Sequence, residues 1–204
     1  MSGIAKLSLR ERKKEATRRE LAVAAYEVIR DHGVDALSAD AVAQRAGVSR
    51  RTFFNYFATV EASVAPIVEE FLDEMLARLP ESIPAGALMA TLAQTVREVY
   101  DHELLERFTV IGLMSHRSLS HKALLYQSVQ GWQERLSAQV AALTGKDEDE
   151  LWVQGVTGAL HGAAEAALVV WIRRTDGEIT PSTIALVRDL LADAIALLGS
   201  GFDD

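Results

Sequence analysis

The chain has 204 residues, of which 49% are hydrophobic and 25% are charged, and its formal net charge is −8. This length and balance suit a globular protein of one large domain, or of a small and a larger one. Because the chain contains no cysteine, disulfides and thiolate metal sites are excluded.

Charge is distributed unevenly along the chain. Residues 1–60 contain eleven Lys and Arg side chains and seven Asp and Glu side chains, so their net charge is about +4 and that of the remainder is about −12. Such asymmetry suggests a part that binds a polyanion joined to a part with another task. Chance unevenness is the alternative.

Targeting signals are not evident. The N-terminus has no apolar run of signal-peptide length. The most apolar stretch, Gly158–Ile172, is too short to span a bilayer and contains His161 and Glu165. We therefore expect a soluble, cytoplasmic protein.

Helical periodicity runs along the chain, without the alternating patterns of strands, so we expect an all-α fold. The first helix is expected from about Leu9 to His32, with Gly33 as a left-handed C-terminal cap. Ser38 is expected to cap a second helix that ends near Ala46.

The next elements are a turn and a short helix. Gly47 lies in a turn of about three residues, and Ser49 is expected to cap a helix over Arg50–Phe57. A longer helix is expected from Thr59 to Leu79, with Pro66 tolerated near its start. Further helices are expected near 85–101, 103–114, 119–144, 148–174 and 181–199. We divide the chain into an N-terminal domain, 1–58, and a larger C-terminal domain, 59–204.

A helix, a turn with Gly and a short polar helix form the helix-turn-helix arrangement. Phe53 and Phe57 are four residues apart and share a face that can pack inward. The other faces carry Arg50, Arg51, Thr52, Phe54, Asn55 and Tyr56. Arginine can bond guanine and asparagine can bond adenine in the major groove, while hydroxyls reach phosphate oxygens. The alternative is a three-helix packing unit with a solvated arginine pair.

Several short runs share the order and spacing of a known domain. They are Arg19-Glu20-Leu21-Ala22 with Ala25, His32-Gly33, Leu37-Ser38 with Asp40, Val42-Ala43, Ala46-Gly47-Val48-Ser49, Thr52-Phe53-Phe54, Tyr56-Phe57 and Glu61. Through them, the segment from about Thr17 to Phe71 resembles the N-terminal domain of TetR-family transcriptional regulators. The resemblance implies an all-helical homodimer with three N-terminal helices on DNA and a larger helical C-terminal domain. Its usual activity is repression that a small molecule relieves.

The same resemblance implies roles for individual residues. Ser38 would cap the second helix and contact a phosphate, and the polar residues of the third helix would face DNA. Phe54 stands where the family often has tyrosine, and Val60 where it usually has lysine. Thr59 at a helix start is expected to replace part of the phosphate contact missing at Val60. The basic arm from Arg10 to Arg19, which includes Arg18, is expected to supply the rest. The alternative for the arm is a solvated, mobile tail.

The last two helices are candidates for dimerisation. Residues 151–172 are rich in Ala and Gly, which permit close helix approach, and residues 184–198 are similarly amphipathic. We expect a homodimer through these helices, which the resemblance also implies. The alternative is that both helices belong only to the intrachain core.

The C-terminal domain offers weaker candidates for a ligand site. If a cavity exists, its lining would come from Phe108, Met114, Tyr126, Trp132, Trp152, His161 and Glu165, and it would suit an apolar or amphipathic molecule. These side chains could equally be plain core, or a buried His–Glu pair. His116, Arg117 and His121 could bind a metal or an acid, but we expect a solvated corner there, with neither metal nor cofactor.

These observations favour a ligand-responsive repressor that binds double-stranded DNA at a near-palindromic operator. A transcriptional activator of the same family is the first alternative. An enzyme using His161 and Glu165 is less favoured, because no nucleophile elbow, phosphate loop or metal motif occurs. A nonspecific DNA-coating protein is disfavoured by the acidic C-terminal part. The effector and the regulated genes are not indicated.

Overall fold

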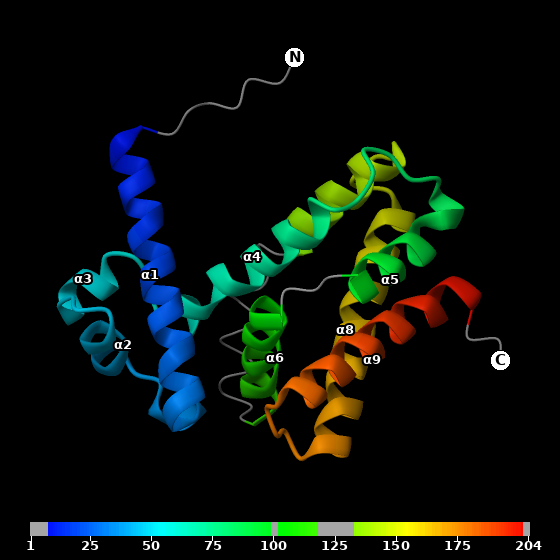
Figure 1. Ribbon diagram of the computed structural model, residues 1–204. Coiled ribbons are helices and arrows are strands. Elements are labelled where there is room, and N and C mark those ends of the chain that lie inside the picture. Colours follow the sequence, from blue (N-terminus) through cyan, green and yellow to red (C-terminus); the bar gives the residue numbers. More distant parts are fainter. Residues whose placement is uncertain (1–7, 99–101, 118–132, 202–204) are drawn as a thin grey trace. The chain divides into compact units, whose positions relative to one another are not determined.

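The computed structural model describes residues 8–98, 102–117 and 133–201 (Figure 1). Every regular element in these ranges is a helix, which confirms the all-α expectation. The chain forms two compact units, Met1–Ile67 and Val68–Asp204. The division between them falls inside one helix, α4 (Ala65–Leu76). The predicted domain boundary after residue 58 stays a prediction.

The N-terminal unit consists of α1 (Leu9–His32), η1 (Val34–Ala36), α2 (Ala39–Arg45), α3 (Arg50–Phe54) and η2 (Glu61–Val64). The helix α1 has the predicted bounds. It begins at a capping box, in which Ser8 Oγ accepts from Glu11 N and Glu11 Oε2 accepts from Ser8 N. At its end Gly33 has a positive φ of 83°, as expected, but its ψ of 166° lies outside the left-handed helical region.

Two predicted helices differ from those observed. The helix α3 ends at Phe54 rather than Phe57, and the chain continues as a turn in which the backbone N–H of Phe57 donates to the carbonyl of Phe53. The long helix expected from Thr59 begins instead as the 3-10 turn η2, and α4 starts at Ala65. Pro66 then lies in the first turn of α4, where its missing N–H has no intrahelical partner to lose.

The C-terminal unit continues with η3 (Ala85–Ala87), α5 (Leu88–Glu98), α6 (His102–Arg117), helical residues 133–144, α8 (Leu151–Thr175) and α9 (Pro181–Ser200). Both α5 and α8 pack along α9 (Figure 1). Trp171 of α8 is fully buried, and its Nε1 donates to the carbonyl of Thr183 at 2.7 Å. Thr180 caps α9 by accepting from Thr183 N at 3.3 Å.

The helix α8 is longer than the apolar stretch seen in the sequence. With 25 residues and a mean hydropathy of 1.3 over its most apolar window, it is long and apolar enough to cross a membrane. A core helix meets the same criteria. One face of α8 packs against α9 and buries Trp171, and 33% of its most apolar window is buried.

Candidate nucleic-acid interface

Two buried aromatic side chains anchor the short helix α3 in the core. Phe53 is fully buried and Phe57 is 4% exposed, with ring centroids 5.6 Å apart. The helix α2 packs against both α1 and α3, and its Val42 is also fully buried. An isolated helix of five residues would not be stable in water. Tertiary burial therefore sets the orientation of α3.

The turn before α3 places its first residue. Gly47 has a φ of 68°, a conformation that glycine adopts without steric cost. The N–H of Val48 donates back to the carbonyl of Ala43, which closes the end of α2. Ser49 then caps α3, as predicted, because its Oγ accepts from Thr52 N at 3.0 Å.

The predicted DNA-facing side chains belong to α3 and to the two residues that follow it, and none of them is buried. Arg50, Arg51, Phe54 and Asn55 are exposed, and Thr52 and Tyr56 are half-buried. Phe54 is 45% exposed although its neighbour Phe53 is fully buried. The outer face of α3 thus combines cationic, amide, hydroxyl and aromatic groups, which are the groups that contact bases and phosphates in a major groove.

The other predicted contact residues lie elsewhere in the N-terminal unit. Ser38 Oγ accepts from Ala41 N, and Thr59 Oγ1 accepts from Ala62 N, each at 3.2 Å. The guanidinium of Arg18 lies over the ring of Phe57, 5.7 Å from its centroid. The side chain of Arg19 is 70% exposed, and its Nε lies 3.5 Å from Oε1 of Glu15 on the same helix. Their contacts with DNA stay predictions.

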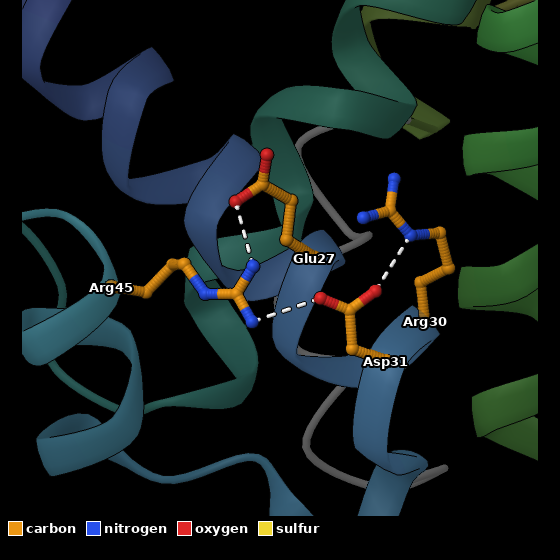
Figure 2. A network of polar contacts seen from close by, with 4 residues as sticks. All are labelled: Glu27, Arg30, Asp31 and Arg45. Atoms are coloured by element: carbon orange, nitrogen blue, oxygen red, sulfur yellow. Dashed lines mark hydrogen bonds and ion pairs between the residues drawn. The ribbon is translucent and has the colours of Figure 1, made fainter.

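A polar network that the sequence analysis did not identify joins α2 to α1 (Figure 2). Arg45 donates from Nη2 to Asp31 at 2.9 Å and from Nη1 to Glu27 at 3.3 Å. Arg30 donates from Nε to the other oxygen of Asp31 at 2.9 Å. Hydrogen bonds from Arg30 and then Arg45 hold the pKa of Asp31 below its ordinary value. The network positions the first helix of the helix-turn-helix on α1.

The C-terminal unit brings some ligand candidates together across α6 and α8. His116 Nε2 approaches Glu165 Oε2 at 3.2 Å, with the two side chains 20% and 34% exposed. The expectation of a solvated corner is therefore wrong for His116, whose partner is 49 residues away in sequence. Phe108 stacks on Phe71 with centroids 4.3 Å apart. Beside them, α6 and α8 approach closely at Gly112, where an added Cβ would lie 2.6 Å from Leu168.

The remaining ligand candidates are placed differently. Trp152 lies under the ammonium of Lys146, 5.1 Å from the ring centroid. It is 13 residues before Glu165 on α8, or about 20 Å along a helix that rises 1.5 Å per residue, so the two cannot touch one small ligand. His161 is half-buried one turn before Glu165. The side chain of Met114, and all of Tyr126, Trp132 and His121, lie outside the described parts of the chain.

Comparison with known proteins accounts for both units. Residues 21–62 match the family described as bacterial regulatory proteins, tetR family, and residues 87–203 match the MftR C-terminal domain. The chain belongs to the TetR family. Family membership makes it a transcriptional regulator and not an enzyme. This confirms the resemblance expected from the short runs of the first sixty residues.

One relative of this TetR-family regulator matches along nearly its whole length. It is a Mycobacterium tuberculosis protein provisionally named as the mycofactocin biosynthesis transcriptional regulator MftR. It is 26% identical over 200 residues, 94% of each chain.

Solved structures of the TetR family share the fold. The multidrug binding protein EbrR, complexed with imidazole, is 23% identical with a TM-score of 0.54 over 85% of this chain and 93% of that one. Thermus thermophilus FadR, in complex with lauroyl-CoA, is 20% identical with a TM-score of 0.52 over 92% of this chain and 95% of that one. At these identities the likeness concerns the fold alone.

Proposed function

We propose that this TetR-family regulator is a homodimeric repressor that binds a near-palindromic operator and leaves it when an effector enters the C-terminal unit. The observation that carries the proposal is the outer face of α3, which is polar and exposed while its inner face is buried. Two such helices would enter successive major grooves about 34–36 Å apart. The protein would act in the cytoplasm, on chromosomal DNA.

The contacts with DNA divide into base reading and backbone positioning. Arg50, Arg51 and Asn55 would read base edges, since their side chains offer paired hydrogen-bonding groups. Phe54 would contact bases through its ring. The hydroxyl-bearing residues and the arm would position the backbone through phosphate contacts: Ser38, Ser49, Thr52, Tyr56, Thr59, Arg18 and Arg19.

The homodimer would form through α8 and α9. One face of α8 carries exposed small residues behind an exposed leucine at its start, Leu151, which is 88% exposed. That face is Leu151, Gly155, Gly158, Gly162 and Ala166. A Cβ added at any of its three glycines would meet nothing within 4 Å among the described residues. This open row would allow the partner's helix to approach closely.

The effector would be an apolar or amphipathic organic molecule. Fold neighbours are described as holding such compounds, namely proflavin for EbrR and lauroyl-CoA for FadR. Phe108 on Phe71 and the His116–Glu165 pair supply apolar and polar groups within one unit. The effector must bind the DNA-free state more tightly than the bound state, because occupancy alone shifts no equilibrium. The helix α4, which both units share, would transmit the change.

The regulated genes would include those of mycofactocin biosynthesis. The support is the match of residues 87–203 to the MftR C-terminal domain and the full-length similarity to a relative with that named role. The matched domain lies outside the DNA-binding helices, and the relative is only 26% identical, so the operator must be tested directly.

The test is binding of the purified full chain to dye-labelled duplexes from upstream of its own gene and of mycofactocin biosynthesis genes. Scrambled duplex serves as competitor, and several salt concentrations are used. Preferential binding, saturating at one or two dimers per site, with release by lauroyl-CoA or proflavin, is the expected result. If scrambled duplex competes as well as the unlabelled upstream duplex, the proposal of sequence-specific binding is wrong. A reporter gene that falls silent on deletion of the regulator would identify an activator instead.

A further inference from the structure

The arginine that opens α3 is held by two neighbours on the outer face. Arg50 Nη1 donates to Asp40 Oδ2 of α2 at 2.8 Å. The guanidinium of Arg50 also lies over the ring of Phe54, 5.5 Å from its centroid. Phe54 in turn meets buried Phe53 edge to face, with centroids 5.3 Å apart. A chain of contacts therefore runs from the core to the guanidinium.

Stability alone does not account for this pair. The side chains of Asp40 and Arg50 are 68% and 61% exposed, and exposed ion pairs contribute little to folding. A carboxylate on a DNA-facing surface also repels phosphates and weakens binding to every sequence. The position of Asp40 thus costs affinity for DNA in general.

The same pair holds the guanidinium of Arg50 in one orientation before it binds a base. A free arginine side chain must be ordered on binding, and a side chain held beforehand loses less freedom. The bond to Asp40 uses one of the five guanidinium N–H donors, which leaves four. Two of these, in the plane of the guanidinium, can bond guanine O6 and N7 together.

We propose that Asp40 is a specificity-determining residue. With Phe54 it holds Arg50 in the orientation that reads one guanine in each operator half-site, and its charge penalises sites where Arg50 finds no guanine. The inference rests on the proposed function, since it assigns a task within operator recognition. Asp40 acts through Arg50 and is a positioning residue.

The experiment starts from a randomised duplex library, from which the wild-type protein enriches its preferred sequence. In that duplex each guanine is replaced singly by 7-deazaguanine, which lacks the N7 acceptor. We expect the wild type to lose about tenfold or more in affinity at one guanine per half-site. Asp40→Asn should lose most of that discrimination while its affinity for scrambled duplex rises.

The control for charge is Asp35→Asn, which makes the same change of net charge at an exposed position in η1 of the same unit. It should raise affinity for all duplexes slightly and leave discrimination intact. In an Arg50→Ala background, Asp40→Asn should have no further effect on discrimination. If the asparagine variant folds poorly, Asp40→Glu keeps the charge but moves the carboxylate by one methylene. It should also lose discrimination at the guanine if the position of the carboxylate is what orients Arg50.

Two results would overturn the inference, and they are distinguishable. If Asp40→Asn raises affinity for enriched and scrambled duplexes by the same factor, as Asp35→Asn does, Asp40 acts only through general electrostatics. The proposed function would survive that result. If the wild type enriches no sequence from the library, the proposed function fails and this inference fails with it.

Discussion

Adjacent residues of α3 have opposite environments. Phe53 is fully buried and Phe54 is 45% exposed. A helix turns by about 100° per residue, so neighbours can face the core and the solvent. The two phenylalanines therefore allow folding and DNA binding to be tested separately with the same chemical change.

Phe53→Ala should destabilise the N-terminal unit by about 3–5 kcal/mol, because it removes a fully buried ring and leaves a cavity. Phe54→Ala should change stability by far less and should weaken operator binding. The measurements are urea unfolding followed by circular dichroism, and duplex binding. Equal loss of stability in the two variants would contradict the assigned faces.

The Arg45 network makes a second prediction at the residue scale. The pKa of Asp31 is lowered in the folded state, from an ordinary value of about 4. Its ion pairs therefore contribute stability above that pH, and the contribution is lost as the pH falls through the folded-state pKa. Asp31→Asn should lower Tm at pH 7, and the difference from wild type should shrink below about pH 4.

Thermal unfolding from pH 3 to pH 8 measures this difference. The control is a chain in which Arg30 and Arg45 are both methionine, where Asp31→Asn should change Tm little at any pH. A difference that is independent of pH would show that the asparagine acts through packing and not through charge.

At the scale of elements, α3 depends on its cap as well as on its buried face. Ser49 accepts from Thr52 N, and its Oγ lies 2.8 Å from Thr52 Oγ1. Ser49→Ala should cost about 1 kcal/mol of stability, as for other N-caps. Ser49→Asp should retain stability, because aspartate caps well and suits the positive helix end.

The same Ser49→Asp variant should bind DNA much more weakly, because it adds a negative charge where α3 would meet the phosphate backbone. Duplex binding at 50 mM and 200 mM salt is the measurement. Unchanged affinity in Ser49→Asp would place the start of α3 away from the DNA.

Element boundaries show what local pattern predicts well. The bounds of α1 are predictable because an apolar stripe is closed by glycine at its end, and the caps of α2, α3 and α9 are predictable from Ser or Thr followed by helix formers. The end of α3 is not, since Phe57 reaches the core from a turn while keeping helical spacing. The start of α4 is not predictable either, since the Thr59 side chain accepts from Ala62 N in the 3-10 turn η2 and α4 begins only after that turn, at Ala65.

Partnerships between elements are not visible in the sequence. Asp40 and Arg50 are ten residues apart, and Arg45 meets Asp31 fourteen residues earlier. The pair of His116 and Glu165 joins two helices across 49 residues. Spacing along one helix predicts neighbours on that helix alone, so the outer face of α3 could be predicted while the groups that position it could not.

At the scale of the whole molecule, the open glycine row of α8 makes the proposed homodimer testable. Gly158→Arg places a long cation where an added Cβ meets no described atom, so the subunit should fold unchanged. The variant should be monomeric by light scattering and should lose operator binding. Gln139→Arg adds the same charge at an exposed position of helical residues 133–144 and should remain dimeric. A dimeric Gly158→Arg would contradict the assigned interface.

The buried Trp171 has a consequence for observing regulation. All three tryptophans, Trp132, Trp152 and Trp171, belong to the C-terminal unit, and the DNA-binding unit has none. Intrinsic tryptophan emission therefore reports only on the unit proposed to hold the effector. A change in emission on adding operator DNA would be a direct optical reading of communication through α4. Coupling free energy between two binding sites is reciprocal. The affinity for the effector, measured by this emission, should therefore fall on adding operator DNA by the same factor by which the effector lowers the affinity for the operator.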